Sequence, residues 1–246
     1  MKKFILKILL LVFPLLVYVS AILLIDPFNY YAFSDFVTYS IKRNAAYSVN
    51  PVLFNLLEFK RNPSSSITIS DSRFAQKNLQ LIEEKSGLKF SEVFVFDGMI
   101  KDIISGFWFA NSQIHLKNVY ISVSFNNFYV SQRNDLVKSA DVVIKDPLLY
   151  SFNLNVINAA YKCINLKYDN SNYDSTSVIN FDKMSFWNDI LIKTKNRFYL
   201  NYSFPQEYFA YLKEIADYCK VNNINLYFVV PPTSIDLQNL IHERFN

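Results

Sequence analysis

Apolar residues along this chain fall into short runs separated by polar segments, a pattern typical of buried strands that alternate with helices. Four such runs predict strands, at residues 66–70, 93–96, 118–124 and 225–230. The segments between and beside them predict helices at 74–85, 100–114, 147–164 and 205–222. Strands and helices that alternate at this spacing favour βαβ units. We therefore expect an α/β protein with a mostly parallel sheet.

The N-terminal segment is apolar over a longer stretch. Three lysines within the first seven residues precede an apolar run from Ile8 to Ile25, whose 18 residues are near the lower limit for a helix that crosses a bilayer. A cleaved signal peptide is the alternative, but apolar residues continue beyond the small residues near position 20, where cleavage would be expected. We expect an uncleaved signal anchor. The flanking lysines favour a cytoplasmic N-terminus, which places the rest of the chain outside the cytoplasmic membrane.

These features divide the chain into three parts. Residues 1–28 are predicted to form the transmembrane anchor, and residues 29–62 a juxtamembrane connector that is partly helical and broken at Pro51. Residues 63–246 are predicted to form an α/β domain, with a polar loop at 165–180. About 215 residues follow the anchor, enough for one globular domain with a substantial core.

Composition argues against some classes of function. The net charge of +4 is modest, and no run of lysine and arginine alternates with aromatic residues, so nucleic acid is not an expected partner. The abundant aromatic residues accompany many Asn, Lys and Ile residues in a chain with only three glycines. This composition indicates an AT-rich coding bias, so the aromatic residues are only weak support for stacking against carbohydrate.

The two cysteines leave two interpretations open. In an oxidising compartment Cys163 and Cys219 are able to form a disulfide. Two buried free thiols on helices are equally compatible with the sequence. Neither cysteine belongs to a Cys-x-x-Cys pair or has a nearby histidine, so we expect no metal site and no other cofactor.

The main candidate for chemistry follows the first predicted strand. Ser70-Asp71-Ser72 stands where this strand passes into a helix, so that backbone N–H groups are able to activate a serine hydroxyl. Gly98 follows the second strand and Asn126 the third, and open parallel sheets place their sites beyond such strand ends. A serine, a glycine N–H and an asparagine amide supply the nucleophile and the oxyanion donors of acyl transfer.

Each of these residues also has a purely structural interpretation. Asp71 and Ser72 are of types that cap helices. Gly98 suits a turn with positive φ, and the Asn126–Asn127 pair suits a turn. Because all three positions follow strand ends of the same predicted sheet, a shared site explains these residues better than three separate structural roles.

With these residues the chain resembles the SGNH/GDSL hydrolase superfamily. The blocks of that family are Gly-Asp-Ser, a lone Gly, Gly-x-Asn-Asp and a late Asp-x-x-His. Residues 70–72 are similar to the first block with Ser in place of Gly, Gly98 resembles the second, and residues 124–127 resemble the third and retain its asparagine as Asn126. The resemblance implies a flavodoxin-like three-layer fold, Ser72 as nucleophile, and Gly98 and Asn126 as the oxyanion hole, with Asp71 and Arg73 beside them.

The predicted anchor and the sequence Ser-Asp-Ser-Arg-Phe at residues 70–74 resemble those of membrane-anchored bacterial members of the family. These members are the DltD-like and O-acetyltransferase-like proteins that modify cell-surface polymers. This resemblance implies an esterase or O-acyltransferase that acts on cell-envelope polysaccharide, with a membrane acyl-donor protein as a partner. Arg73 and Lys101 would attract an anionic polymer, although solvated surface charges are the ordinary alternative.

The late block of the family is the one that this sequence does not match. The chain has two histidines, His115 and His242. No carboxylate stands three residues before His242, which belongs to a predicted surface helix at 235–245, and His115 precedes the third strand and so lies at the opposite edge of the sheet. We therefore expect a C-terminally incomplete domain, as in a truncated or degenerate copy. Two functions remain open: an enzyme that is inactive in this short form, or a non-catalytic binding or assembly protein of the cell envelope.

Overall fold

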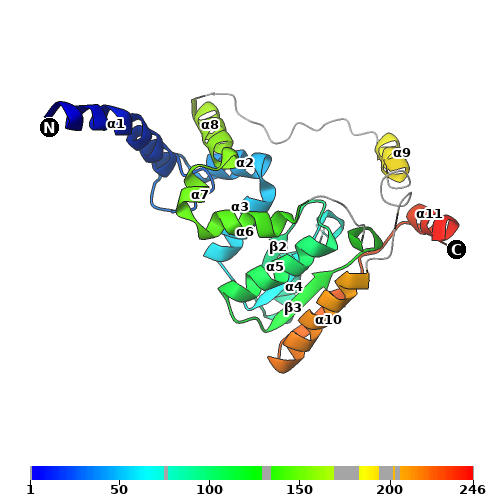
Figure 1. The fold of residues 1–246 in the computed structure, drawn as a ribbon. Helices are drawn as coiled ribbons and strands as arrows, with labels where there is room; N and C mark the ends of the chain where they lie inside the picture. Colours follow the sequence, from blue (N-terminus) through cyan, green and yellow to red (C-terminus); the bar gives the residue numbers. More distant parts are fainter. Residues whose placement is uncertain are drawn as a thin grey trace. The chain divides into compact units, whose positions relative to one another are not determined.

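A computed structural model of the chain describes residues 2–74, 77–128, 134–168, 183–193, 202 and 206–245 (Figure 1). Its internal contacts divide the chain into two compact units. The first unit comprises Met1–Arg61 and Leu136–Ser171, and the second comprises Asn62–Asp135 and Asn172–Asn246. Each unit is described by itself below.

The second unit contains a four-stranded, all-parallel sheet, which confirms the predicted α/β class. Its strands are β1 (Ser66–Ser70), β2 (Phe90–Phe94), β3 (Asn118–Ser122) and β4 (Asn225–Val229). Their order across the sheet is β2-β1-β3-β4. Because β1 lies between β2 and β3 and all three run parallel, their carboxyl ends lie at one edge of the sheet.

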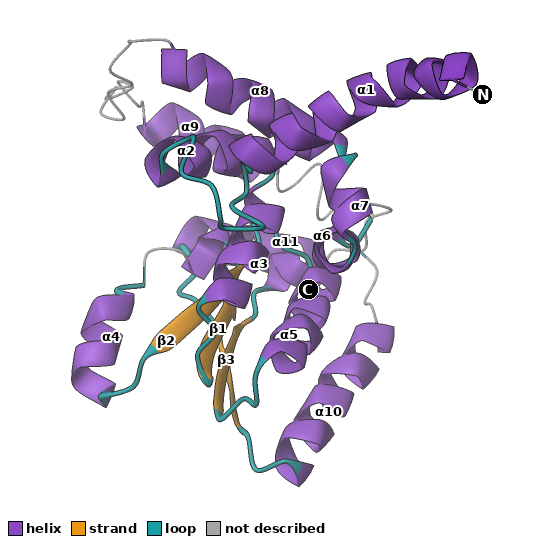
Figure 2. Cartoon of the chain, turned by 90° about the vertical axis from the view of Figure 1, so that its left-hand side faces the viewer, coloured by secondary structure: helices purple, strands orange, loops and turns teal. Residues whose placement is uncertain are grey.

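Helices lie on both sides of this sheet. Those of the second unit are α4 (Leu79–Ser86), α5 (Ile100–Gln113), α9 (Lys183–Lys193), α10 (Gln206–Val221) and α11 (Ile235–Phe245). In Figure 2, α5 and α10 lie on one side of the strands and α4 lies on the other. Gly106 allows α5 to approach the sheet closely, since a Cβ atom there would lie 3.1 Å from Cγ1 of Val93 and 3.3 Å from Cγ2 of Ile69.

Several element boundaries differ from those predicted. The helix predicted from residue 74 begins instead at Leu79, because the Asn78 side chain accepts a hydrogen bond from the Leu81 amide and caps the helix there. Strand β2 begins at Phe90, three residues before the predicted start, and β3 ends at Ser122, two residues before the predicted end. The helices predicted at 100–114 and 205–222 match α5 and α10 within a residue at each end.

The first unit is helical in its described part. Its helices are α1 (Lys2–Ile25), α2 (Tyr39–Val49), α3 (Pro51–Arg61), α6 (Leu136–Lys145), α7 (Pro147–Ser151) and α8 (Leu154–Tyr168). Helix α2 packs against α8, and α3 packs against α6. Residues of the predicted connector therefore fold together with a segment that lies about a hundred residues further along the chain, an association that the sequence pattern does not indicate.

The helix predicted at 147–164 is two helices in the structure. Asp146 caps α7, because its Oδ1 accepts hydrogen bonds from the amides of Leu148 and Leu149 at 2.8 and 3.2 Å. The chain then breaks before α8, where the Asn153 side chain accepts a hydrogen bond from the Asn155 amide at 2.8 Å. Part of the predicted polar loop at 165–180 belongs to α8, and its remainder lies outside the described residues.

Asp26 joins the end of α1 to the rest of the first unit. The residue is fully buried, and its carboxylate accepts hydrogen bonds from the amides of Tyr30, Tyr31 and Ala32 at 2.7, 3.0 and 2.9 Å. The Tyr150 hydroxyl of α7 donates to the same carboxylate at 3.1 Å. Within the described part of the chain, no helix combines the length and the apolar character that a membrane span requires.

Candidate functional site

The candidate site forms at the carboxyl edge of the sheet, where three strand ends meet. Asp71 and Ser72 follow β1 and lead into a short 3-10 helix, Ser72–Phe74. Gly98 follows β2, and Asn126 and Asn127 belong to a second 3-10 helix after β3, Phe125–Phe128. The sheet topology thus brings together the residues that the sequence predicted for a shared site.

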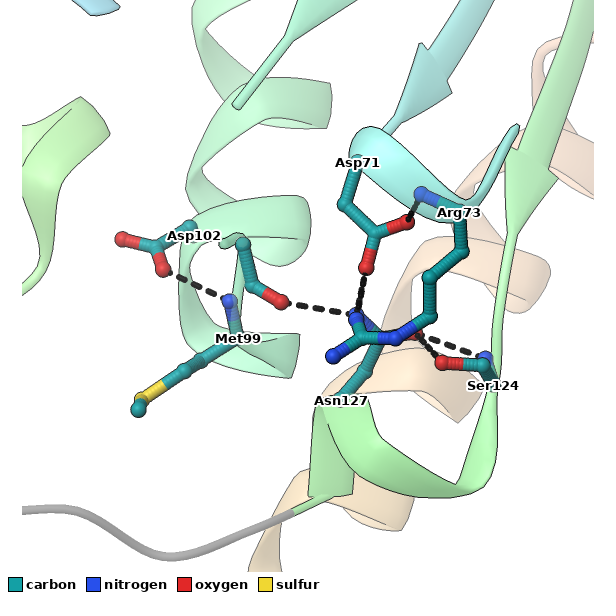
Figure 3. Close-up of polar contacts among 7 residues, drawn as sticks. Asp71, Arg73, Met99, Asp102, Ser124 and Asn127 are labelled. Carbon is teal, nitrogen blue, oxygen red and sulfur yellow. Dashed lines mark hydrogen bonds and ion pairs between the residues drawn. The ribbon is translucent and has the colours of Figure 1, made fainter. Parts of the chain in front are cut away.

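Asn127 connects the three strand ends. Its side chain is fully buried, and its Nδ2 donates hydrogen bonds to Oδ2 of Asp71 and to the carbonyl oxygen of Gly98, both at 2.7 Å (Figure 3). Its Oδ1 accepts hydrogen bonds from the amide and the hydroxyl of Ser124 at 2.6 and 2.8 Å. Both amide hydrogens and the amide oxygen are therefore satisfied inside the protein. The resemblance to the hydrolase family assigned no role to this residue.

Asp71 belongs to the same buried network. Its side chain is only 1% exposed, its Oδ1 accepts a hydrogen bond from the Arg73 amide at 2.9 Å, and its Oδ2 forms an ion pair with the Arg73 guanidinium. The Asp71 carbonyl accepts the Phe74 amide at 3.1 Å, so this aspartate caps the first 3-10 helix. The capping interpretation of Asp71 therefore holds, and Arg73 neutralises the buried carboxylate.

Gly98 lies beneath the surface of the site. Its N–H donates to the Val95 carbonyl at 3.1 Å, while its own carbonyl accepts from Asn127. The positive φ in this turn belongs to Asp97, at 52°, so the expected need for a glycine with positive φ does not apply to Gly98. The glycine is required for close approach, because a Cβ atom there would lie 3.1 Å from the Val95 oxygen and 3.4 Å from Cβ of Asp71.

A cavity of about 670 Å³ opens above this network. Ser72, Arg73 and Asn126 line it from two strand ends, and Ser72 is exposed. Helix α9 contributes Trp187, Ile190 and Lys193 to its wall, and the segment after β4 contributes residues 231–234 together with two residues of α11. The structure therefore places the predicted nucleophile and one predicted oxyanion donor on the same cavity, whereas Gly98 is not among the lining residues.

The cavity lining is largely apolar and aromatic, with a few polar groups. Phe96, Phe125 and Trp187 line it, and Tyr202 stacks on Phe125 with ring centroids 4.7 Å apart. Burial raises the pKa of Tyr202 above its ordinary value, so this hydroxyl stays protonated near neutral pH. The lining combines hydroxyl, amide and guanidinium groups, the Asp97 carboxylate and the Lys193 amine with aromatic faces, which together suit a ligand that is partly polar and partly apolar.

Neither histidine of the chain lines the cavity. His242 is exposed on α11, in the helix that the sequence predicted at 235–245. His115 is exposed just before β3, and so lies at the opposite edge of the sheet. Among the described residues, no group of three His, Cys, Asp or Glu side chains is arranged to hold a metal ion.

A second buried polar cluster lies at the end of β1. The Ser70 side chain is fully buried, and its hydroxyl donates a hydrogen bond to Oε1 of Glu92 at 2.6 Å. Nζ of Lys77 lies 3.1 Å from the same hydroxyl and forms an ion pair with Glu92. This cluster was not predicted from the sequence, although Ser66, Thr68 and Ser70 alternate with apolar residues along the strand.

Comparisons of this chain with protein-family models, with curated proteins and with solved structures found no match.

Proposed function

We propose that this protein is a membrane-anchored, extracytoplasmic member of the SGNH type, with a flavodoxin-like three-layer domain that binds acylated cell-envelope polysaccharide. Its chemistry would be that of an esterase or O-acyltransferase, with Ser72 as the nucleophile. One observation carries the proposal: Ser72 and Asn126 come from two different strand ends and line the same cavity of about 670 Å³. A nucleophilic hydroxyl and an amide donor at one concave surface are the arrangement that acyl transfer requires.

In the proposed reaction the Ser72 oxygen attacks the ester carbonyl, and the Asn126 amide donates a hydrogen bond to the oxyanion. The ester C–O bond then breaks, and the alcohol leaves with the proton lost by Ser72. Water or an acceptor hydroxyl takes the acyl group from Ser72 in the second step and returns a proton to the Ser72 oxygen. The N–H of Gly98 already bonds the Val95 carbonyl, so it would have to be shared with the oxyanion or released to it. The Asp71–Asn127 network supports the two strand ends from below. A membrane acyl-donor protein is the proposed partner that supplies the acyl group.

The second candidate is a non-catalytic envelope protein that uses the same cavity for binding or assembly. It is favoured by the position of the two histidines, because neither lines the cavity and a serine hydroxyl without a general base is a weak nucleophile near neutral pH. Oxyanion donors without the triad leave a residual rate of on the order of 10³ to 10⁴ over water in well-studied enzymes. We therefore expect this chain to bind its ligand with negligible turnover.

The test uses the purified full chain in detergent. Acetylated and deacetylated forms of the same oligosaccharide are titrated in a Trp108→Phe variant, so that fluorescence reports on Trp187 in the cavity wall. We expect the acetylated form to bind more tightly, and we expect ester hydrolysis to be equally slow with Ser72 and with Ser72→Ala. Robust hydrolysis that Ser72→Ala abolishes would refute the non-catalytic candidate. Absence of binding to both oligosaccharides, together with absence of hydrolysis, would refute the function proposed for the cavity.

The proposed location rests on the lysines that precede the apolar run Ile8–Ile25. Protease added outside spheroplasts should digest both folded units, while an N-terminal fragment stays with the membrane. Recovery of the intact chain in the soluble cytoplasmic fraction would overturn this assignment.

A further inference from the structure

Exposed apolar side chains of the first unit occur on α1 and also form a group on α7 and the start of α8. Leu148 is 71% exposed and Leu154 is 75% exposed. Leu149 and Phe152, between them in the sequence, are about half exposed. Four large apolar side chains exposed within seven consecutive positions form a surface that needs a partner.

This surface is continuous with α1. The Tyr18 hydroxyl donates a hydrogen bond to the Ser151 carbonyl at the end of α7, and the Tyr18 ring stacks on Phe152 with centroids 5.4 Å apart. The same stretch of α1 exposes Leu15 and Leu16. Figure 1 shows α7 and the start of α8 next to the C-terminal half of α1. The exposed apolar residues of the two segments therefore form one surface.

The polar groups of α7 are satisfied within the protein. The Asp146 carboxylate accepts two amides at the start of the helix, and the Ser151 hydroxyl donates to the Pro147 carbonyl at 2.9 Å. At the other end, the Phe152 amide bonds the Leu148 carbonyl at 3.0 Å, and Tyr18 bonds the Ser151 carbonyl. These bonds pair backbone groups at both ends of α7, as insertion into lipid requires, because each unpaired backbone group there costs several kcal/mol.

Charged residues border α7 and the start of α8 but do not occur within this stretch. No Asp, Glu, Lys or Arg occurs from residue 147 to residue 161, and none occurs from Ile8 to Ile25. The charged residues at the borders of this stretch are Lys145 and Asp146 before it and Lys162 after it. An uncharged stretch of aliphatic and aromatic side chains with charged residues at its borders has the composition of a segment that dips into a bilayer.

We propose that α7 and the start of α8 insert into the outer leaflet of the membrane beside α1, with lipid acyl chains as their partner. The inference rests on the membrane location proposed above. Tyr18 lies seven residues before the end of α1 at Ile25, or about 10 Å along the helix axis at 1.5 Å per residue. Residues that contact Tyr18 are therefore at a depth of roughly 5–10 Å, which is the usual depth for interfacial insertion. The first unit is thus attached to the membrane at two points.

The test uses nitroxide labels on single cysteines in the full chain, reconstituted in vesicles of phosphatidylethanolamine and phosphatidylglycerol. The labelled variants are Leu148→Cys and Leu154→Cys, with Leu16→Cys as the lipid reference. Tyr168→Cys is the matched control, because Tyr168 is 71% exposed like Leu148 but lies at the far end of α8, about 21 Å from Leu154 along the helix. The unsubstituted chain gives the background from its two buried thiols.

Collisions with oxygen, which concentrates in lipid, are compared with collisions with a water-soluble nickel chelate. At Leu148 and Leu154 we expect the collision rate with oxygen to exceed that with the chelate several-fold, as at Leu16. At Tyr168 we expect the collision rate with the chelate to be the higher of the two. If Leu16 is lipid-exposed while Leu148 and Leu154 resemble Tyr168, the insertion of α7 is wrong and the anchor stands. If Leu16 also resembles Tyr168, both the anchor and the insertion are wrong.

Discussion

Nδ2 of Asn127 donates a hydrogen bond to Oδ2 of Asp71 at 2.7 Å, between two buried side chains that are 56 residues apart in the sequence. This bond joins the ends of β1 and β3, and the second amide hydrogen of Asn127 joins both to the turn after β2. The wall of the cavity around Ser72 therefore depends on a side chain that does not itself line the cavity.

Substitution Asn127→Ala should destabilise the second unit by about 3 kcal/mol. It leaves the Asp71 carboxylate, the Gly98 carbonyl and the Ser124 amide with unsatisfied hydrogen-bonding capacity, and buried groups without partners typically cost about 1–3 kcal/mol each, partly offset by relaxation. Urea unfolding followed by tryptophan fluorescence measures this effect, since both tryptophans, Trp108 and Trp187, belong to the second unit.

The adjacent residue is the matched control. Asn126 lines the cavity, so Asn126→Ala should change the free energy of unfolding by less than about 1 kcal/mol while it weakens ligand binding. If Asn126→Ala proves to be the more destabilising of the two substitutions, the assignment of the structural role to Asn127 is wrong.

The sequence predicted the sheet better than it predicted the site. Short runs rich in β-branched and aromatic residues, such as Val119-Tyr120-Ile121, favour a strand, and polar residues at strand ends indicate which edge carries the chemistry. Which of two adjacent asparagines is buried, however, depends on the path of the backbone through the 3-10 helix after β3. Family resemblance indicated Asn126, whereas the hydrogen-bond network is centred on Asn127.

Substitution Glu92→Gln should destabilise the second unit by about 2 kcal/mol. The Lys77 side chain is only 5% exposed, and the substitution removes its counter-charge while the shape of the residue is kept. Breaking a buried pair by the loss of one partner typically costs about 3–5 kcal/mol, and the 26% exposure of Glu92 reduces this value.

An exposed ion pair provides the comparison for Glu92. Lys213 and Asp217 are 75% and 62% exposed on α10, so Asp217→Asn should cost less than about 0.5 kcal/mol. Added salt should reduce the contribution of this surface pair more than that of the Lys77–Glu92 pair. Equal effects of Glu92→Gln and Asp217→Asn would show that the Lys77–Glu92 pair is solvated.

The two cysteines are free, buried thiols in the structure, on α8 and α10. Burial raises the pKa of Cys163 to about 12 and that of Cys219 to about 11. An aromatic disulfide reagent at pH 8 should therefore modify neither thiol in the folded chain within minutes, and it should modify both in denaturant without reductant. Failure to titrate any thiol in denaturant would establish a disulfide instead.

The same shifts predict a dependence of stability on alkaline pH. The folded chain keeps both thiols protonated, whereas the unfolded chain begins to ionise them near pH 9, so the unfolded state binds fewer protons above that pH. The contribution of the thiols to the free energy of unfolding is full below pH 9 and declines as the pH rises toward 11. A Cys219→Ser variant should show a smaller decline over this range than the unsubstituted chain.

The association of residues 29–61 with residues 136–168 was the part of the fold least accessible from sequence. The sequence predicts helices in both segments, including one at 147–164, but no local feature of the sequence indicates that the two segments pack together. Long-range contacts hold the two segments together, such as the Tyr30 hydroxyl, which donates a hydrogen bond to the Ile144 carbonyl at 3.0 Å across 114 residues. Periodicity reports on local structure, and no local pattern encodes a partner at that separation.

The last prediction concerns the missing general base. If Ser72 is a nucleophile that lacks a base, external imidazole should partly replace it, because the cavity of about 670 Å³ has room for a ring beside a bound acetyl ester. We expect imidazole to accelerate hydrolysis of an acetylated oligosaccharide several-fold, well below the 10²- to 10⁴-fold that a positioned base provides. The acceleration should grow as pH rises through the pKa of imidazole, since only its neutral form accepts the proton. The Ser72→Ala variant lacks the nucleophile, so its imidazole-dependent hydrolysis measures the direct reaction of imidazole with the ester. The acceleration in the unsubstituted chain should exceed this background. If imidazole accelerates both variants equally, Ser72 is not a nucleophile and the cavity is a binding site alone.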